Sequence, residues 1–293
     1  MFERFSAENV ETPRGEVHLR IGGSGPPLLL LHGFPQTHLM WHAVAPRLAE
    51  HFSLVVADLP GYGESFRPPV SDDHSAHSKR ELARDLVAAM AALGHRSFLV
   101  AGHDRGGRVA YRMALDEPDV VQRLAVLDIV PTGEIWSRAD WRFAIGYWHW
   151  GFLAQAAPLP ERMMLADPEG FWVCVERMGI KVGDARFPDE AVAAYRAQLR
   201  DPESVTAMCE DYRAGATIDR QLDAEDRSTR TVGCPVRVMW GADGALPYFY
   251  DDPLELWLPY TTEATGRAVA GAGHFLVEDQ PDEVATDLLE FFS

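Results

Sequence analysis

The chain has 293 residues and a formal net charge of −17, from 27 basic and 44 acidic side chains. Hydrophobic residues make up 47% of it, which is typical of a folded protein with a full core and excludes a disordered chain. The acidic balance disfavours a nucleic-acid partner, because contacts to phosphates require a basic surface. No apolar run is long enough to cross a bilayer, and the charged start MFERFSAENV lacks the apolar centre of a secretory signal.

The chain carries three cysteines, Cys174, Cys209 and Cys234. An odd, scattered set is typical of reduced thiols rather than of a disulfide framework. We therefore expect a cytoplasmic protein that has no membrane partner.

The first part of the chain alternates continuous apolar runs with amphipathic segments. Strands are expected at 16–22, 27–31, 52–57, 97–101 and 124–128. Helices are expected at 41–50, from the capping box Ser78-x-x-Glu81 to Leu93, and from the turn after residue 101 to about 116. Strands that alternate with helices indicate an α/β fold, with a mostly parallel sheet and helices on both faces.

The alternation stops at Pro131 and resumes with expected strands at 235–240 and near 267–270, then a helix at 281–292. Between Pro131 and about Leu222 the sequence shows only helical stretches rich in Trp, Tyr, Phe and Met. We therefore predict an α/β core made of residues 1–130 and 223–293, into which residues 131–222 are inserted as a helical cap.

Small residues surround one polar side chain in the turn GHDRGG at 102–107. This turn joins a buried strand to a helix, which is the layout of a nucleophile elbow. Glycines are needed there because the strand and the helix nearly touch, so that a Cβ would collide. The residue at the nucleophile position is Asp104.

An aspartate at this position indicates displacement at a saturated carbon. A carboxylate that attacks such a carbon forms an alkyl ester, which water can cleave to regenerate the aspartate. A serine would instead form an ether, which is a dead end. Asp104 therefore favours dehalogenation or epoxide opening and argues against esterase, lipase or peptidase chemistry.

Hydrolysis of that ester needs a base and an oxyanion hole. His274 lies in the sequence GAGHF at 271–275, after the last expected strand, and would activate the water. The backbone N–H groups of Phe34, in the sequence HGFP, and of Arg105 would stabilise the oxyanion.

Two aspartates compete to orient this histidine. Asp243 follows the strand that ends at Trp240, the commoner location for such an acid, whereas Asp128 ends the strand before the cap. The usual pattern Gly-x-x-Asp would place Gly244 at the acid position, with Asp243 one residue early. We therefore prefer Asp128.

Arg105 and Arg108 lie beside Asp104 at the start of a helix, where anions are favoured. Two guanidinium groups at this place would clamp a substrate carboxylate. The alternative is that they pair with structural acids, such as Asp128 or a carboxylate of the cap.

The predicted cap contributes three side chains that carry an N–H or O–H donor, His149, Trp150 and Tyr212. Aromatic clusters in an inserted cap most often pack against the core. A departing halide, however, needs hydrogen-bond donors, and fluoride needs the most because its bond to carbon is the strongest. These three residues are therefore the candidate halide site.

Taken together, the motifs resemble the fluoroacetate dehalogenases of the α/β-hydrolase fold. The matching segments cover nearly the whole chain: HGFPQTHLMW at 32–41, GHDRGGRVAYRMALD at 102–116, LDIVP at 127–131, YWHW at 147–150, DYRAGATID at 211–219 and GAGHF at 271–275. The resemblance implies Asp104 as nucleophile, His274 as base and Asp128 as its acid, and it implies the same carboxylate clamp and halide site. It further implies a homodimer that takes a small anionic haloacid and uses neither a cofactor nor a metal.

The chain departs from this family at two places. Gly151 stands where a bulky aromatic residue is expected, and the stretch 242–259 looks unlike the family. Both departures would loosen the pocket.

The sequence thus predicts hydrolytic dehalogenation of a short 2-haloacid, with fluoroacetate and water giving glycolate and fluoride. An epoxide hydrolase, the main alternative, shares the aspartate and the histidine but uses two cap tyrosines, and His149 takes one of their places. A haloalkane dehalogenase tends to carry Trp, not Arg105, after the nucleophile. A ligand-binding protein without activity is disfavoured by the intact set of Asp104, Asp128 and His274.

Overall fold

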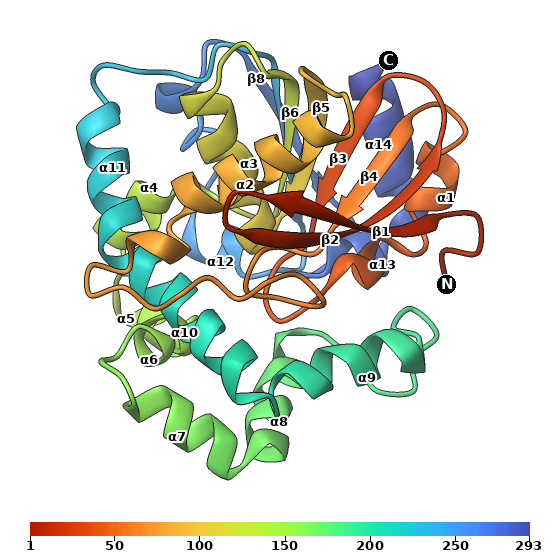
Figure 1. The fold of residues 1–293 in the computed structure, drawn as a ribbon. Coiled ribbons are helices and arrows are strands. Elements are labelled where there is room, and N and C mark those ends of the chain that lie inside the picture. The colour runs from red at the N-terminus through yellow and green to blue at the C-terminus, as the bar shows by residue number, and fades with distance from the viewer.

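The computed structural model describes residues 1–293, and one eight-stranded sheet runs through its centre (Figure 1). The strands are β1 Ser6–Thr12, β2 Gly15–Gly23, β3 Pro27–Leu31, β4 Ser53–Ala57, β5 Phe98–His103, β6 Val121–Leu127, β7 Val236–Gly241 and β8 Ala264–Val269. Their order across the sheet is β1-β2-β4-β3-β5-β6-β7-β8. β2 pairs antiparallel with β1 and β4, and all other neighbouring pairs are parallel.

Helices cover both faces of this sheet. In Figure 1, α2 (Lys79–Ala92) and α3 (Asp104–Asp116) lie in front of the strands, and α14 (Pro281–Phe292) lies behind them. The remaining core helices are the short α1 (Ala45–Leu48), α12 (Leu246–Phe249) and α13 (Leu276–Asp279). The predicted α/β fold with a mostly parallel sheet is confirmed.

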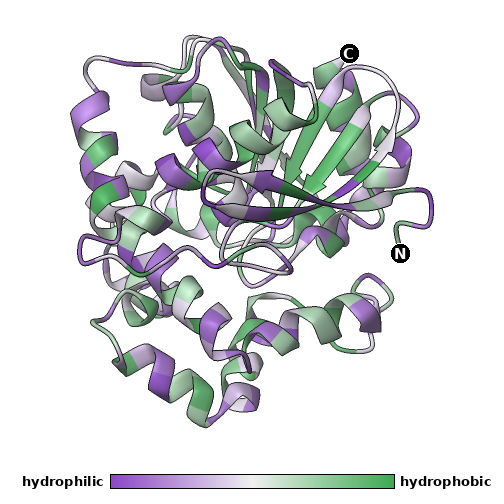
Figure 2. Ribbon diagram, in the orientation of Figure 1, coloured by the Kyte–Doolittle hydropathy of each residue, from purple (hydrophilic) through white to green (hydrophobic).

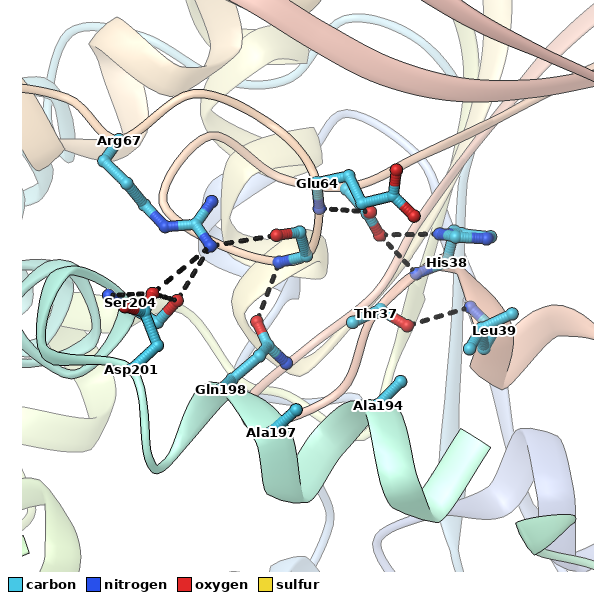
Figure 3. Close-up of a pocket in the computed structure, with 12 residues that line it drawn as sticks. Thr37, His38, Leu39, Glu64, Arg67, Ala194, Ala197, Gln198, Asp201 and Ser204 are labelled. Atoms are coloured by element: carbon cyan, nitrogen blue, oxygen red, sulfur yellow. Dashed lines mark hydrogen bonds and ion pairs between the residues drawn. The ribbon is translucent and has the colours of Figure 1, made fainter. Parts of the chain in front are cut away.

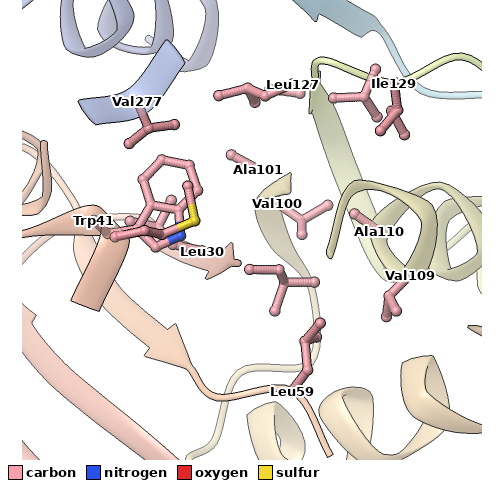
Figure 4. Close-up of a cluster of buried hydrophobic side chains, with 14 of the residues drawn as sticks. Leu30, Trp41, Leu59, Val100, Ala101, Val109, Ala110, Leu127, Ile129 and Val277 are labelled. Atoms are coloured by element: carbon pink, nitrogen blue, oxygen red, sulfur yellow. The ribbon is translucent and has the colours of Figure 1, made fainter. Parts of the chain in front are cut away.

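The parallel strands form the centre of the hydrophobic core. β3 and β5 are buried along nearly their whole length, as expected for strands with helices on both faces. In Figure 4, Leu30, Val100 and Leu127 from three neighbouring strands belong to one buried cluster with Val109 and Ala110 of α3. Figure 2 shows the same contrast, with hydrophobic central strands and hydrophilic residues along the outer helices.

The sequence missed β1 because this strand lies at the edge of the sheet and is mostly polar and exposed. It pairs with β2 along its full length, from Ser6 opposite Ile21 to Thr12 opposite Gly15. A strand with both faces exposed to solvent shows no alternation of apolar and polar residues, so hydrophobic periodicity does not predict it.

The helix expected at 41–50 is wrong as a continuous element. The segment forms a 3₁₀ turn at His38–Trp41 and then the four-residue helix α1. Pro46 lies in the first turn of α1. Proline lacks the N–H that a preceding helical turn would need, so the two pieces stay separate.

Eight helices and no strand lie between β6 and β7. They are α4 (Thr132–Ser137), α5 (Trp141–Gly146), α6 (Trp148–Leu153), α7 (Leu159–Ala166), α8 (Pro168–Met178), α9 (Asp189–Gln198), α10 (Pro202–Ala216) and α11 (Ile218–Asp226). In Figure 1, α5 to α10 lie together beyond one end of the sheet. The boundary predicted at Leu222 falls inside α11. No helix of the chain has both the length and the apolar character needed to span a bilayer.

Candidate active site

Asp104 stands at the junction of β5 and α3, in a turn that allows almost no side chains around it. Its φ angle is +44°, a left-handed conformation that costs a residue other than glycine about 1–3 kcal/mol. A Cβ on Gly106 would lie 2.3 Å from the carbonyl oxygen of His32, and one on Gly102 would lie 2.4 Å from that of Gly106. The close approach of strand and helix therefore requires glycines and holds Asp104 in its strained position.

The carboxylate of Asp104 is buried and faces a backbone donor. The N–H of Phe34, in the loop after β3, donates to its Oδ2 at 2.9 Å. Burial alone would raise the pKa of Asp104, but the nearby charges of His274 and Arg105, with smaller contributions from others, outweigh it and lower that pKa. The group is therefore a carboxylate at neutral pH, which a nucleophile needs to be.

The structure brings Asp128, and not Asp243, against His274. The distance from His274 Nδ1 to Asp128 Oδ2 is 2.6 Å, and the other oxygen of Asp128 accepts from the N–H of Gly241 at 3.0 Å. Asp128 follows β6 with a φ angle of +51°. Asp243 instead lies in a turn, where its N–H donates to the carbonyl of Ala272.

This contact changes the basicity of His274. Burial lowers the pKa of the imidazole, but the hydrogen bond and the charge of Asp128, together with the charge of Asp104, raise it further than burial lowers it. The bond to Nδ1 leaves Nε2 free to accept a proton.

Arg105 is almost fully buried and is bound by an acid of the helical segment. Its Nε donates to Oδ2 of Asp211 at 2.6 Å, and its Nη2 donates to the carbonyl oxygen of the same residue at 2.8 Å. Its Nη1 is buried and has no partner. The alternative of pairing with a structural acid thus holds for its Nε, while Nη2 is bound by a backbone carbonyl. Asp211 is a residue for which the sequence suggested no role.

Arg108 is also buried, but its guanidinium contacts neutral groups. Its Nη1 donates to the carbonyl of Val130 at 3.0 Å and to Oγ1 of Thr132 at 3.1 Å, while its Nε has no partner. Burial and the neighbouring charge of Arg105 lower the pKa of Arg108. Its positive charge is not matched by an ion pair and is available to an anion.

The three candidate halide ligands come together from two helices, His149 and Trp150 from α6 and Tyr212 from α10. The Tyr212 ring packs edge-on against both, with centroid distances of 5.9 Å to His149 and 5.7 Å to Trp150. Burial lowers the pKa of His149 to about 3, so the imidazole is neutral. Cation–π contacts join the cluster to the arginines: Arg105 Cζ is 4.1 Å from the Tyr212 ring centroid, and Arg108 Cζ is 4.7 Å from that of Trp150.

A small, tightly enclosed cavity of about 10 Å³ unites most of these groups. Arg105 and Tyr212 do not border it, but both contact Trp150, which does: Arg105 Cζ is 5.3 Å and the Tyr212 ring centroid 5.7 Å from the Trp150 ring. The sequence missed its apolar wall, because side chains from four separate segments form it. The lining residues are Asp104, Arg108, Asp128, Ile135, Tyr147, His149, Trp150, Met178, Leu246 and His274.

A wider and more open cavity shares Tyr147, His149, Met178 and His274 with the inner one. We infer that it is the approach from the surface. Gly151 borders neither cavity, and a Cβ at this position would meet no atom within 4 Å. The expectation that Gly151 loosens the pocket is therefore wrong. The stretch 242–259 does contribute, since Leu246 borders the inner cavity.

Only one cluster of side chains has the spacing of metal ligands, and it lies away from Asp104. His18, His38 and Asp58 each offer a ligand atom within 4.8 Å of the others. These atoms already bond within the protein: His38 Nδ1 contacts Asp58 Oδ1 at 2.9 Å, and Arg20 Nε donates to His38 Nε2. Figure 3 shows His38 beside a separate cavity between the core and α9. The cluster fits a structural role, because it holds loops together and a guanidinium adjoins it.

Comparison with known proteins agrees with the fold and with the family suggested by the motifs. The model of the alpha/beta hydrolase fold matches residues 26–281. The chain is 44% identical to a fluoroacetate dehalogenase from Burkholderia sp, over 100% of this chain and 95% of that protein. It is 31% identical to a soluble epoxide hydrolase from Corynebacterium sp, over 94% and 93% of the two chains. The solved structure of a putative alpha/beta hydrolase from Nostoc sp PCC 7120 is 42% identical, covers 100% of this chain and 99% of its own, and superimposes with a TM-score of 0.96.

Proposed function

This chain belongs to the α/β-hydrolase fold family and, within it, to the fluoroacetate dehalogenases, and we propose that it hydrolyses short 2-haloacids such as fluoroacetate to the 2-hydroxyacid and halide. The observation that carries the proposal is the inner cavity. A buried carboxylate at an elbow and a buried guanidinium without an acidic partner face the same small space, with neutral N–H donors beside them.

In the first step Asp104 attacks the α-carbon of the haloacid. The new C–O bond forms as the carbon–halogen bond breaks, the bonding electron pair leaves with the halide, and the carbon is inverted. Arg108, which borders the cavity, binds the substrate carboxylate. The unpartnered Nη1 of Arg105, beside the Trp150 wall, is the second donor once the substrate occupies the site, and the two fix the α-carbon in front of Asp104. This clamp favours an acid over a neutral haloalkane.

The leaving halide is bound by the donors on α6 and α10. Trp150 offers its indole N–H, Tyr212 its hydroxyl, and His149 one N–H of a neutral imidazole. In a dry cavity such donors stabilise the charge that develops on the halogen far more than they would in water. Fluoride gains most from them, because it is the smallest and most strongly hydrogen-bonded halide.

In the second step water cleaves the ester at the carbonyl carbon of Asp104. His274 accepts the proton of the attacking water, and Asp128 orients the imidazole and stabilises its protonated form. The N–H of Phe34, which contacts the carboxylate already, and the N–H of Arg105 stabilise the oxyanion. As this intermediate collapses, His274 returns its proton to the leaving oxygen, which releases the hydroxyacid. The remaining proton of the water is lost to solvent, and Asp104 is regenerated as a carboxylate.

We expect the rate of ester hydrolysis to rise with pH through the pKa of His274, because only the neutral imidazole accepts a proton from water. Since that pKa is raised, the rising limb lies above pH about 6.5, the ordinary histidine value. Asp128→Asn removes the charge that raises it, so the limb moves to lower pH and the rate falls about a hundredfold or more. Rates of glycolate release in single turnovers at a series of pH values measure both effects. A limb that stays in place would contradict the role of Asp128.

Halide release from fluoroacetate, chloroacetate and bromoacetate tests the proposed function directly. The expected result is release from all three acids, little from neutral chloroacetamide, and no diol from styrene oxide. Release from the amide as readily as from the acid would refute the clamp. Absence of release from every haloacid would refute the function.

Epoxide hydrolysis is the second candidate, since a relative that is 31% identical has that name. One observation favours it: Tyr147 borders the inner cavity and Tyr212 contacts the Trp150 wall of that cavity, so two phenols are available to protonate an epoxide oxygen. A neutral epoxide, however, makes no use of the charge of Arg108. Diol formation from styrene oxide without release of halide would decide for this candidate.

We further propose that residues 131–222 act as a cap that closes the site, and that the enzyme is a cytoplasmic homodimer. The proposal of a cap rests on the origin of the halide ligands, since α6 and α10 both belong to the inserted helices.

Light scattering of the purified protein tests the proposed homodimer, and a monomeric mass would contradict it.

A further inference from the structure

The two arginines of the proposed clamp differ in their surroundings, and Arg105 has a carboxylate bound to it. Asp211 Oδ2 accepts from its Nε at 2.6 Å, and both residues are buried. An ion pair at this distance in a water-excluded site nearly cancels the positive charge as seen from a third group. On its own, the pair of Arg105 and Asp211 would attract a substrate carboxylate only weakly.

A buried lysine contacts the other oxygen of the same carboxylate. Lys79, the first residue of α2, is 2% exposed. Its ammonium group donates to Oδ1 of Asp211 and to Oδ2 of Asp219, the latter at 3.2 Å. The backbone N–H of Lys79 also donates to Asp219 Oδ1 at 2.9 Å, and the hydroxyl of Tyr62 donates to Asp211 Oδ2 at 3.0 Å.

The charges of this network balance only when the lysine is present. Arg105 and Lys79 carry two positive charges, and Asp211 and Asp219 carry two negative ones. His77, two residues before Lys79, is neutral, because burial lowers its pKa to about 4. Without Lys79 the network would have one surplus negative charge behind a cavity that must accept an anion.

We propose that Lys79 is a positioning residue for the substrate carboxylate, acting through Arg105. Its ammonium group neutralises part of the negative charge of Asp211, so that the positive charge of Arg105 still attracts the carboxylate. The inference rests on the proposed function, because it assumes an anionic substrate. Lys79 does not contact that substrate directly, because its ammonium group is bound by Asp211 and Asp219; it acts through Asp211 on Arg105. It is thus a determinant of charge selectivity on the core side of the interface with the cap.

The test compares two double variants that remove the same lysine and one acid each. In Lys79→Met, Arg105 is the only cation left on Asp211, and the affinity for acetate, an unreactive carboxylate, should fall about tenfold or more. Asp211→Asn in this background removes that counter-charge, while the amide oxygen still accepts from Arg105, so affinity should return to within about threefold of the wild type. Asp219→Asn removes an equal charge that does not contact Arg105, and it should restore less.

Acetate affinity is measured by calorimetry, without turnover, and KM and kcat for chloroacetate are measured on the same proteins. The expected result is a higher KM with little change in kcat for Lys79→Met, and near wild-type values for Lys79→Arg. Thermal melting shows that each variant is folded. If Lys79 only joined the cap to the core, both double variants would show the same loss of acetate affinity.

Equal affinities in the two double variants, or unchanged acetate binding in Lys79→Met, would overturn the inference. These outcomes are distinct from failure of the proposed function. If the proposed function fails, the wild-type protein binds acetate but releases no halide. If the enzyme is active and its KM for chloroacetate is unchanged by Lys79→Met, only the inference is refuted.

Discussion

Replacing Asp104 with asparagine should lower halide release by about 10⁴-fold or more, the effect seen when a catalytic nucleophile is lost. The amide is a far weaker nucleophile than the carboxylate, but it has nearly the same shape. The contact with the N–H of Phe34 is therefore retained, and so is the clamp. The expected pattern is loss of kcat with acetate affinity close to that of the wild type.

Asp104→Ala is the matched control, because alanine cannot be converted back to aspartate by hydrolysis of a side-chain amide. Both variants should be inactive. If Asp104→Ala releases halide at the wild-type rate, Asp104 is not the nucleophile.

Oxygen-18 water distinguishes attack by the protein from attack by water. With enzyme in excess and one turnover, the heavy atom should enter the side chain of Asp104, because water attacks the carbonyl carbon of the ester. The first molecule of hydroxyacid then carries an unlabelled oxygen that came from the protein. Label found directly in the hydroxyacid, with none in Asp104, would mean that water displaced the halide.

The elbow could be predicted from the sequence because every interaction that defines it is local. The elbow is one short continuous segment, made of the end of β5, the glycines, Asp104 and the start of α3. The glycines at the close contacts show directly in the sequence that a Cβ would not fit there. The preference for Asp128 over Asp243 also came from local register, and Asp128 is the one that contacts His274.

The difference between Arg105 and Arg108 could not be predicted in this way. The two residues are one helical turn apart and have the same chemistry, so the sequence pattern predicts the same role for both. Their surroundings differ because Asp211, which is 106 positions away from Arg105, approaches from α10. Sequence patterns report which side chains share a helix face, but not which distant acid the folded chain brings to that face.

The burial of Lys79 could not be predicted for the same reason. A lysine beside a capping serine at the start of a helix is typical of an exposed position, since a lysine is almost never fully buried without a partner. Here two aspartates from α10 and α11 provide the partners. Only the packing of the inserted helices against α2 makes that burial possible, and no local pattern records it.

His274→Asn should separate the two chemical steps and trap the enzyme as an ester. Attack on the α-carbon needs the carboxylate and the clamp, whereas hydrolysis needs a base. Alkylation of Asp104 should therefore continue in the variant, although the lost positive neighbour slows it, while ester hydrolysis slows by about 10²–10⁴-fold. After exposure to chloroacetate, the intact protein should be heavier by one carboxymethyl group.

Peptide mapping of the trapped protein should place this group on Asp104, and the double variant Asp104→Asn, His274→Asn should stay unmodified. One equivalent of halide released per protein, with no further turnover, is the matching kinetic result. An unmodified His274→Asn protein that still releases halide continuously would contradict the covalent intermediate. In that case His274 would be activating water for direct attack on the α-carbon, and the strained placement of Asp104 beneath the cavity would need another explanation.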